Sequence, residues 1–166
     1  GRDYGGASKW WLDKSLSALS RDIEALGGRL TLRTGNPSSI LSEIIAQTGA
    51  SAVFWNRRYD EAGRETDTEI KAHLKSEGVT VETFNGSLLT EPWTQKTGTG
   101  GYYKVYSPYW RSVQANYVCP DALPRPRALS SPMIGSEELD SWGLHPYAPD
   151  WSAGFNPYWA PGEAGA

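Results

Sequence analysis

Charged side chains gather after one short apolar segment and are the first candidates for chemistry in this sequence. Residues 52–55 (Ala-Val-Phe-Trp) are followed closely by Arg57 and Arg58, and then by Arg64 and Asp67. Guanidinium groups form paired hydrogen bonds with carboxylates and with phosphates. The cluster therefore predicts one of two things: an arginine–carboxylate network that fixes a loop, or a site that binds an anion.

Other polar groups have suitable residue types but lack the spacing that their chemistry requires. The glycines in residues 98–101 do not form a phosphate loop, because no helix opens directly after them as such a loop requires. His73 and His145 have no second ligand at metal-site spacing, so we predict no metal site. Glu61 and Glu65 have no nucleophile beside them, and we interpret them as part of a solvated turn.

Composition narrows the class of protein further. The 166 residues carry 16 Lys and Arg against 19 Asp and Glu, so this segment is not expected to bind nucleic acid by itself. A single cysteine, Cys119, excludes an intrachain disulfide and fits a reducing cytoplasm. No apolar run approaches the roughly 20 residues of a membrane span. A start at Gly1 and an end at Ala166 suggest a piece of a longer protein.

Hydrophobic periodicity predicts two helices in the first 50 residues. The first has Ser8 as its N-cap and ends at Gly27, because an apolar stripe repeats every three or four residues between them. The stripe consists of Leu12, Leu16, Leu19, Ile23 and Leu26. Asn36 followed by Pro37 predicts the start of a second helix, which ends before Gly49.

Three short apolar or alternating segments predict strands: residues 30–32, 52–55 and 79–84. Thr66 and Glu69 form a capping-box pattern for a helix between the last two segments. Strands that alternate with helices in this way form right-handed parallel units. The predicted class is therefore α/β, with a parallel sheet and flanking helices.

The second half of the chain has less regular patterns. Residues 88–89 suggest a short helical piece, and residues 106–111 a helix with Pro108 in its first turn. Pro, Ser, Gly and Trp dominate from Pro120 to Pro161, which predicts a long irregular linker. Within it, residues 136–139 suggest one helical turn.

Six motifs in order along the chain resemble the N-terminal domain of the DNA photolyase/cryptochrome family. They are residues 6–12 (GASKWWL), 55–59 (WNRRY), 64–67 (RETD), 84–92 (FNGSLLTEP), 103–111 (YKVYSPYWR) and 159–166 (WAPGEAGA). Residues 1–117 then correspond to a Rossmann-like antenna-binding domain that lacks the first two strands of the family. Residues 118–157 correspond to the interdomain linker, and residues 158–166 to the start of a helical domain.

The resemblance implies the function of a longer parent protein. That parent is a deoxyribodipyrimidine photolyase, which uses light and reduced FAD to split cyclobutane pyrimidine dimers in DNA. In the family, FAD and damaged DNA bind to the helical domain, so we expect this segment alone to be inactive and to bind neither. In the strand order of the family, residues 53–55 pair with residues 79–84, and residues 30–32 are detached or find a substitute partner.

The resemblance also indicates two antenna contacts. Glu82 falls where some members bind a reduced folate, methenyltetrahydrofolate, and Asn85 falls where members that bind 8-hydroxydeazaflavin carry Asp. A carboxylate accepts paired hydrogen bonds from a pterin edge, whereas Asn presents one donor and one acceptor group. We therefore expect folate, with deazaflavin as the alternative. The alternative that Glu82 is an ordinary surface residue stays open.

Three alternative functions are compatible with these patterns. The parent can be a cryptochrome-type blue-light photoreceptor, which shares the same motifs. The chain can be a stand-alone Rossmann-like module for a nucleotide or small ligand, although no phosphate-binding loop follows its first predicted strand. It can also be a partly folded fragment without activity.

Overall fold

The computed structural model describes residues 3–155 and 157–165 and divides into two compact units. One unit combines Gly1–Thr48 with Arg125–Ala166, and the other is Gly49–Pro124. No helix in the described ranges is long and apolar enough to cross a membrane. Each unit is considered separately below.

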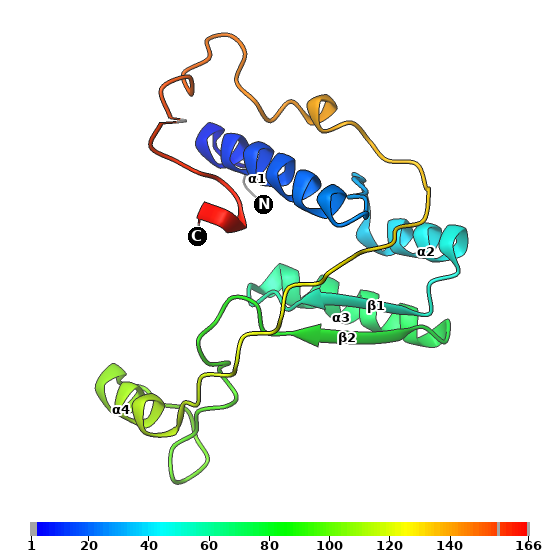
Figure 1. Ribbon diagram of the computed structural model, residues 1–166. Coiled ribbons are helices and arrows are strands. Elements are labelled where there is room, and N and C mark those ends of the chain that lie inside the picture. The colour runs from blue at the N-terminus through cyan, green and yellow to red at the C-terminus, as the bar shows by residue number, and fades with distance from the viewer. Residues whose placement is uncertain (1–2, 156, 166) are drawn as a thin grey trace. The chain divides into compact units, whose positions relative to one another are not determined.

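The unit Gly49–Pro124 is built around two parallel strands, β1 (Ala52–Asn56) and β2 (Thr80–Phe84). Ala52 lies opposite Thr80, and Asn56 lies opposite Phe84, so the two strands are aligned along their whole length. Helix α3 (Glu61–Ser76) connects them, as Figure 1 shows. This arrangement confirms the predicted α/β class and the predicted pairing of residues 53–55 with the strand after Gly78.

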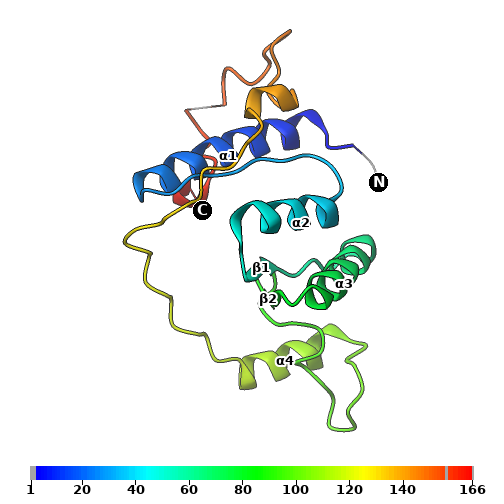
Figure 2. The ribbon, with the colours of Figure 1, turned by 90° about the vertical axis from the view of Figure 1, so that its right-hand side faces the viewer.

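The core of this unit lies between α3 and the sheet. Ile70 and Leu74 of α3 are buried, as are Val79 and Val81 at β2, and Leu74 has no exposed surface at all. Figure 2 shows α3 beside the two strands, seen nearly along their direction. Burial of a leucine or valine side chain stabilises a fold by about 1.5–3 kcal/mol. This layer therefore fixes the position of α3 against the strands.

Helix α3 starts earlier than its sequence pattern suggested. Its N-cap is Asp60, whose Oδ1 accepts a hydrogen bond from the backbone N–H of Gly63 at 2.7 Å. The expected capping box at Thr66 is wrong, because Thr66 lies inside the helix and its hydroxyl donates to the carbonyl oxygen of Ala62. Glu61 and Glu65 likewise lie in α3 and not in a solvated turn, and Glu61, in the first helical turn, has its carboxylate near the positive end of the helix dipole.

The first helix of the other unit, α1 (Gly6–Ala25), starts just after Gly5 and not after the expected N-cap Ser8. Its most buried apolar side chain is Trp10, 3% exposed, which meets the ring of Phe155 edge-on at 5.3 Å. The predicted leucine stripe is only partly covered, and Leu19 remains 42% exposed. Contacts with the returning chain, and not the stripe alone, therefore determine which face of α1 is buried.

The second helix, α2 (Pro37–Thr48), begins as predicted from the Asn-Pro pair. The side-chain oxygen of Asn36 accepts a hydrogen bond from the backbone N–H of Ser39 at 3.1 Å. Pro37 occupies the first helical position, where the missing N–H is not needed. The sequence pattern thus predicts this helix start correctly.

Residues 30–32 do not form the expected strand. The backbone N–H of Leu32 donates to Ser136 Oγ at 2.9 Å, and the Leu32 carbonyl accepts from the N–H of Glu137 at 2.9 Å. The N–H of Arg29 likewise donates to Ser131 Oγ. Because serine hydroxyls replace backbone carbonyls as acceptors, no regular ladder forms. This segment finds its substitute partner in residues 131–137.

The remaining elements are short. Helix α4 (Tyr106–Asn116) contains the predicted helix around Pro108. Residues 88–89 are not helical, and the expected turn at residues 136–139 forms instead as a short 3₁₀ helix at Leu139–Trp142. Ser136 and Glu137 stay extended because they bind the backbone of Leu32 and Thr34. A second 3₁₀ turn spans Glu163–Gly165.

Candidate functional site

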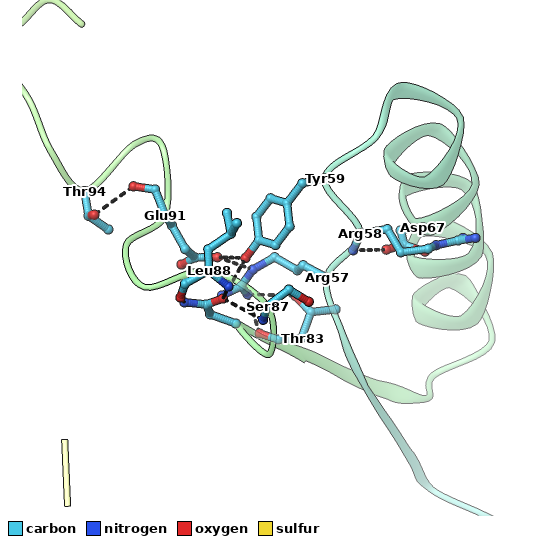
Figure 3. A network of polar contacts seen from close by, with 10 residues as sticks. Arg57, Arg58, Tyr59, Asp67, Thr83, Ser87, Leu88, Glu91 and Thr94 are labelled. Atoms are coloured by element: carbon cyan, nitrogen blue, oxygen red, sulfur yellow. Dashed lines mark hydrogen bonds and ion pairs between the residues drawn. The ribbon is translucent and has the colours of Figure 1, made fainter. Parts of the chain in front are cut away.

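The carboxyl ends of β1 and β2 bring two polar segments together, because parallel strands end on the same side of a sheet. The N–H of Arg57 donates to the carbonyl oxygen of Phe84 at 2.9 Å and extends the pairing by one residue. The side chains of Arg57 and Tyr59 then point toward the loop after β2, whereas Arg58 points toward α3 (Figure 3). This alternation is typical of an extended backbone.

Arg57, Tyr59 and Glu91 form a hydrogen-bonded knot in the loop after β2. Glu91 Oε1 accepts hydrogen bonds from Arg57 Nε and from the Tyr59 hydroxyl, both at 2.7 Å. Arg57 Nη1 also donates to the carbonyl oxygen and hydroxyl of Thr83. Burial raises the pKa of Glu91, but the hydrogen bonds from Tyr59 and Arg57 outweigh it and hold that pKa below its usual range. Glu91 is therefore a carboxylate at neutral pH.

On the opposite side, Arg58 is tied to α3 by Asp67. Asp67 Oδ1 accepts hydrogen bonds from Arg58 Nη2 at 2.6 Å and Nε at 3.0 Å, and Oδ2 accepts from the Arg58 backbone N–H. Partial burial raises the pKa of Asp67, but other interactions, chiefly the hydrogen bonds from the side chain and the backbone of Arg58, lower it by more. The pair therefore holds the end of β1 against the helix.

These contacts agree with the first of the two alternatives from the sequence, an arginine–carboxylate network that fixes a loop. Arg57 and Arg58 each belong to an arginine–carboxylate pair that fixes a loop or a helix. Sequence reasoning did not identify Glu91 as the partner of Arg57, although the Glu-Pro pair at residues 91–92 lies within one of the quoted motifs. The distance along the chain, 34 residues, gave no local signal.

Asn85 uses its side chain to fold its own loop. Asn85 Oδ1 accepts hydrogen bonds from the backbone N–H groups of Ser87 and Leu88, at 3.2 and 3.0 Å, and from the Tyr59 hydroxyl at 3.3 Å. Its Nδ2 donates to the carbonyl oxygen of Leu88. The next residue is Gly86, where a side chain does not fit because a Cβ would lie 2.4 Å from the side-chain amide of Asn56. The side-chain amide of Asn85 therefore holds this loop together and lies next to the Tyr59–Glu91 knot.

Glu82 lies on the exposed face of the two-stranded sheet, directly opposite Phe54 in the strand pairing. Phe54 and Phe84 on this face are 58% and 49% exposed, and their ring centroids are 6.3 Å apart. No hydrogen bond or ion pair of the Glu82 carboxylate occurs with any other residue that the structure describes. The face thus presents two aromatic rings and a free carboxylate, which is a surface suited to a flat, hydrogen-bonding ligand.

The two sequence-predicted contacts therefore have different surroundings. Glu82 accompanies Phe54 and Phe84 on the sheet face, while Asn85 accompanies Tyr59 in the loop. Within residues 3–155 and 157–165, no three His, Cys, Asp or Glu side chains are grouped as metal ligands would be.

Comparison with known proteins gives consistent matches along the chain. The family model described as DNA photolyase matches residues 1–127. A deoxyribodipyrimidine photo-lyase from Agrobacterium fabrum is 44% identical over 164 residues, which are 98% of this chain and 34% of the relative. Cryptochrome-2 from Arabidopsis thaliana is 34% identical over 136 residues, 81% of this chain and 22% of the relative.

Solved structures give the same result. The crystal structure of a bacterial class III photolyase from Agrobacterium tumefaciens matches with a TM-score of 0.89 and 45% identity, over 97% of this chain and 34% of that one. A Synechocystis cryptochrome, at 18% identity and a TM-score of 0.67, over 78% of this chain and 27% of that one, shares the fold. The chain spans about a third of the length of the photolyases that it matches.

Proposed function

Because this chain belongs to the DNA photolyase family, we propose that it is the N-terminal part of a light-driven, FAD-dependent lyase that repairs cyclobutane pyrimidine dimers in DNA. The observation that carries the proposal is the 44% identity to a deoxyribodipyrimidine photo-lyase along nearly the whole chain. In the complete protein, a helical domain binds FAD and damaged DNA, and residues 1–117 belong to the antenna-binding domain. A cytoplasmic location agrees with the single free cysteine, Cys119.

The contribution of this chain, in the proposal, is to house the light-harvesting antenna, and a reduced folate fits best. Its pterin is flat and carries an amide and amine edge that pairs with a carboxylate. The exposed rings of Phe54 and Phe84 offer a stacking surface, and the free carboxylate of Glu82 lies beside them. These three residues would bind and orient the folate; the chromophore itself supplies the absorption of near-ultraviolet light.

The hydrogen bonds of Asn85 also favour folate over deazaflavin. A deazaflavin contact at this position would need the side chain of Asn85, whose amide nitrogen and oxygen already bind Leu88, Ser87 and Tyr59. Recruiting Asn85 to a ligand would break hydrogen bonds that shape the loop. Glu82 has no such competing contacts, so it is the better candidate for the antenna.

The experiment uses the complete protein purified with its chromophores. Glu82→Gln keeps the size of the side chain but removes the charge that pairs with a pterin edge. We expect this variant to retain less folate per FAD, measured by near-ultraviolet absorbance, while repair under light absorbed directly by FAD persists. The control is Glu69→Gln, an exposed glutamate of α3 in the same unit. Unchanged folate content in the Glu82 variant would mean that Glu82 is an ordinary surface residue and not an antenna contact.

A cryptochrome-type photoreceptor is the second candidate, because Cryptochrome-2 from Arabidopsis thaliana is 34% identical over 81% of this chain. Both candidates predict bound FAD in the complete protein, and repair separates them. Restoration of dimer-containing DNA under blue light would establish the photolyase. A protein that binds FAD and leaves the dimers intact would favour the photoreceptor.

A further inference from the structure

A separate cavity lies on the α3 side of the strand ends, and the antenna proposal makes no use of it. Its volume is about 190 Å³. Its lining includes four cationic side chains, one carboxylate and one indole ring: Arg57, Arg58, Arg64, Lys71, Asp67 and Trp93. The sequence showed no basic run, because the fold gathers these cations from two segments of the chain.

Two of the four cations are already neutralised. Arg57 pairs with Glu91, and Arg58 pairs with Asp67. Arg64 and Lys71 form no ion pair with any described residue. The cavity therefore carries two surplus positive charges.

Three glutamates lie near Arg64 on the adjoining surface of α3: Glu61, Glu65 and Glu69. None of them forms an ion pair with Arg64, and none lines the cavity. The opposite charge nearest to Arg64 inside the cavity is Asp67, which Arg58 occupies with two side-chain hydrogen bonds. The one carboxylate among the described residues that line the cavity is therefore already paired.

The donors are arranged on both sides of the cavity. Arg64 and Lys71 are seven residues apart on α3, which is close to two helical turns, so they extend from the same face of the helix. Arg58 contributes from the end of β1, where Asp67 fixes its Nε and Nη2, while its Nη1 has no hydrogen bond with any residue that the structure describes. The fixed guanidinium of Arg58 and the two surplus cations can therefore approach one anion from different directions.

The volume limits the size of that anion. A phosphate or diphosphate group fits a cavity of about 190 Å³. The rest of a ligand that carries such a group can lie outside, against the wall of the cavity.

That wall carries an aromatic platform. Trp93 is 49% exposed, the guanidinium of Arg57 lies 5.8 Å from its ring centroid, and the ring of Tyr59 lies 6.1 Å away at 33°. Planar bases stack on such rings without regard to sequence. We propose that the cavity binds the phosphate groups of a free nucleotide through Arg64 and Lys71, with the base against Trp93.

The test is calorimetric titration of the complete protein, at low ionic strength, with ADP, with inorganic pyrophosphate and with a thymidine octanucleotide. ADP and pyrophosphate should bind to the unaltered protein. The double variant Arg64→Gln/Lys71→Gln should weaken both by about tenfold or more, because it removes the two positive charges that no carboxylate of the cavity neutralises. Lys75→Gln removes the same charge from the same helix outside the cavity and should leave both affinities unchanged.

The aromatic part of the proposal has its own pair of variants. Trp93→Leu should weaken ADP binding and leave pyrophosphate binding intact, because only ADP carries a base. The control, Tyr102→Leu, removes an exposed ring of the same unit that does not line the cavity. If the double variant fails to fold by circular dichroism, the single variant Arg64→Gln, at an exposed position, provides the same comparison.

Three results would overturn the proposal. The first is no measurable binding of ADP or pyrophosphate to the unaltered protein. The second is an equal loss in Lys75→Gln, which would show attraction to the general charge of α3 and not to a site. The third is binding of the octanucleotide, weakened in the double variant, without binding of ADP, which would assign the surface to single-stranded DNA.

Discussion

Gly63 provides a test of the close packing that positions α3, because two opposing effects there have known sizes. Replacing a glycine inside a helix by alanine normally stabilises the helix by about 1 kcal/mol. At Gly63, however, a Cβ would lie 2.7 Å from Arg58 Cβ and 2.5 Å from Asp60 Oδ2, and Gly63 itself is buried. The Asp60 carboxylate can rotate away, but only by giving up the cap of α3, and Arg58 Cβ cannot move without the backbone.

The expected sign follows from these sizes. Overpacking costs about 1–3 kcal/mol, and loss of the Asp60 cap costs about 1 kcal/mol. Against the gain in helix propensity, Gly63→Ala should lower the free energy of unfolding by about 1–3 kcal/mol. Urea unfolding of the 166-residue chain, followed by circular dichroism, measures the difference.

A matched glycine and a double variant make the result specific. At Gly98 a Cβ meets no atom within 4 Å, so Gly98→Ala should change stability by less than about 0.5 kcal/mol. Asp60→Gly removes one source of the clash, so Gly63→Ala should cost less in that background. A Gly63→Ala variant that is more stable than the unaltered chain would refute the described contact with Arg58.

Two further predictions concern the core and the Arg58–Asp67 pair. Leu74→Ala removes a side chain with no exposed surface and should lower the free energy of unfolding in urea by about 2–5 kcal/mol. Leu19→Ala, at a position that is 42% exposed, should lower it clearly less. Equal losses would mean that α3 does not form the core. The pKa of Asp67 is lowered in the folded state, so its contribution is present above its ordinary value of 3.8 and is lost as the pH falls through the lower folded pKa. Asp67→Asn should therefore cost about 1 kcal/mol at neutral pH, because Arg58 is half-exposed, and the difference should vanish in strong acid; a difference that is constant with pH would contradict the ion pair.

Local signals in the sequence predicted the elements whose partners are close along the chain. The Asn36-Pro37 pair located the start of α2, because the Asn36 cap binds Ser39 only three residues away. Arg58 and Asp67 are nine residues apart and were identified together. The alternation of apolar segments with an intervening helix also predicted the parallel pairing of β1 and β2.

Contacts between distant segments explain what the sequence did not predict. Residues 30–32 have a strand-like pattern, but the partners of Leu32 lie about a hundred residues later, and one of them is the hydroxyl of Ser136. The start of α3 was misplaced because Asp60 and Thr66 are both acceptable caps, and in the structure the N–H of Gly63 donates to Asp60, while Thr66 lies inside the helix. The sequence indicated Arg57, Arg58 and Arg64 as possible anion-binding residues, but it did not identify Lys71 or Trp93, which join them only through the fold.

The action spectrum of DNA repair by the complete protein tests the central claim, an antenna-bearing part of a photolyase, most directly. Dimer-containing DNA is illuminated at a series of wavelengths, and restored thymines are counted per absorbed photon. We predict repair in a near-ultraviolet folate band as well as in the flavin band, with the folate band selectively reduced in Glu82→Gln. Bound FAD without repair at any wavelength would contradict the account.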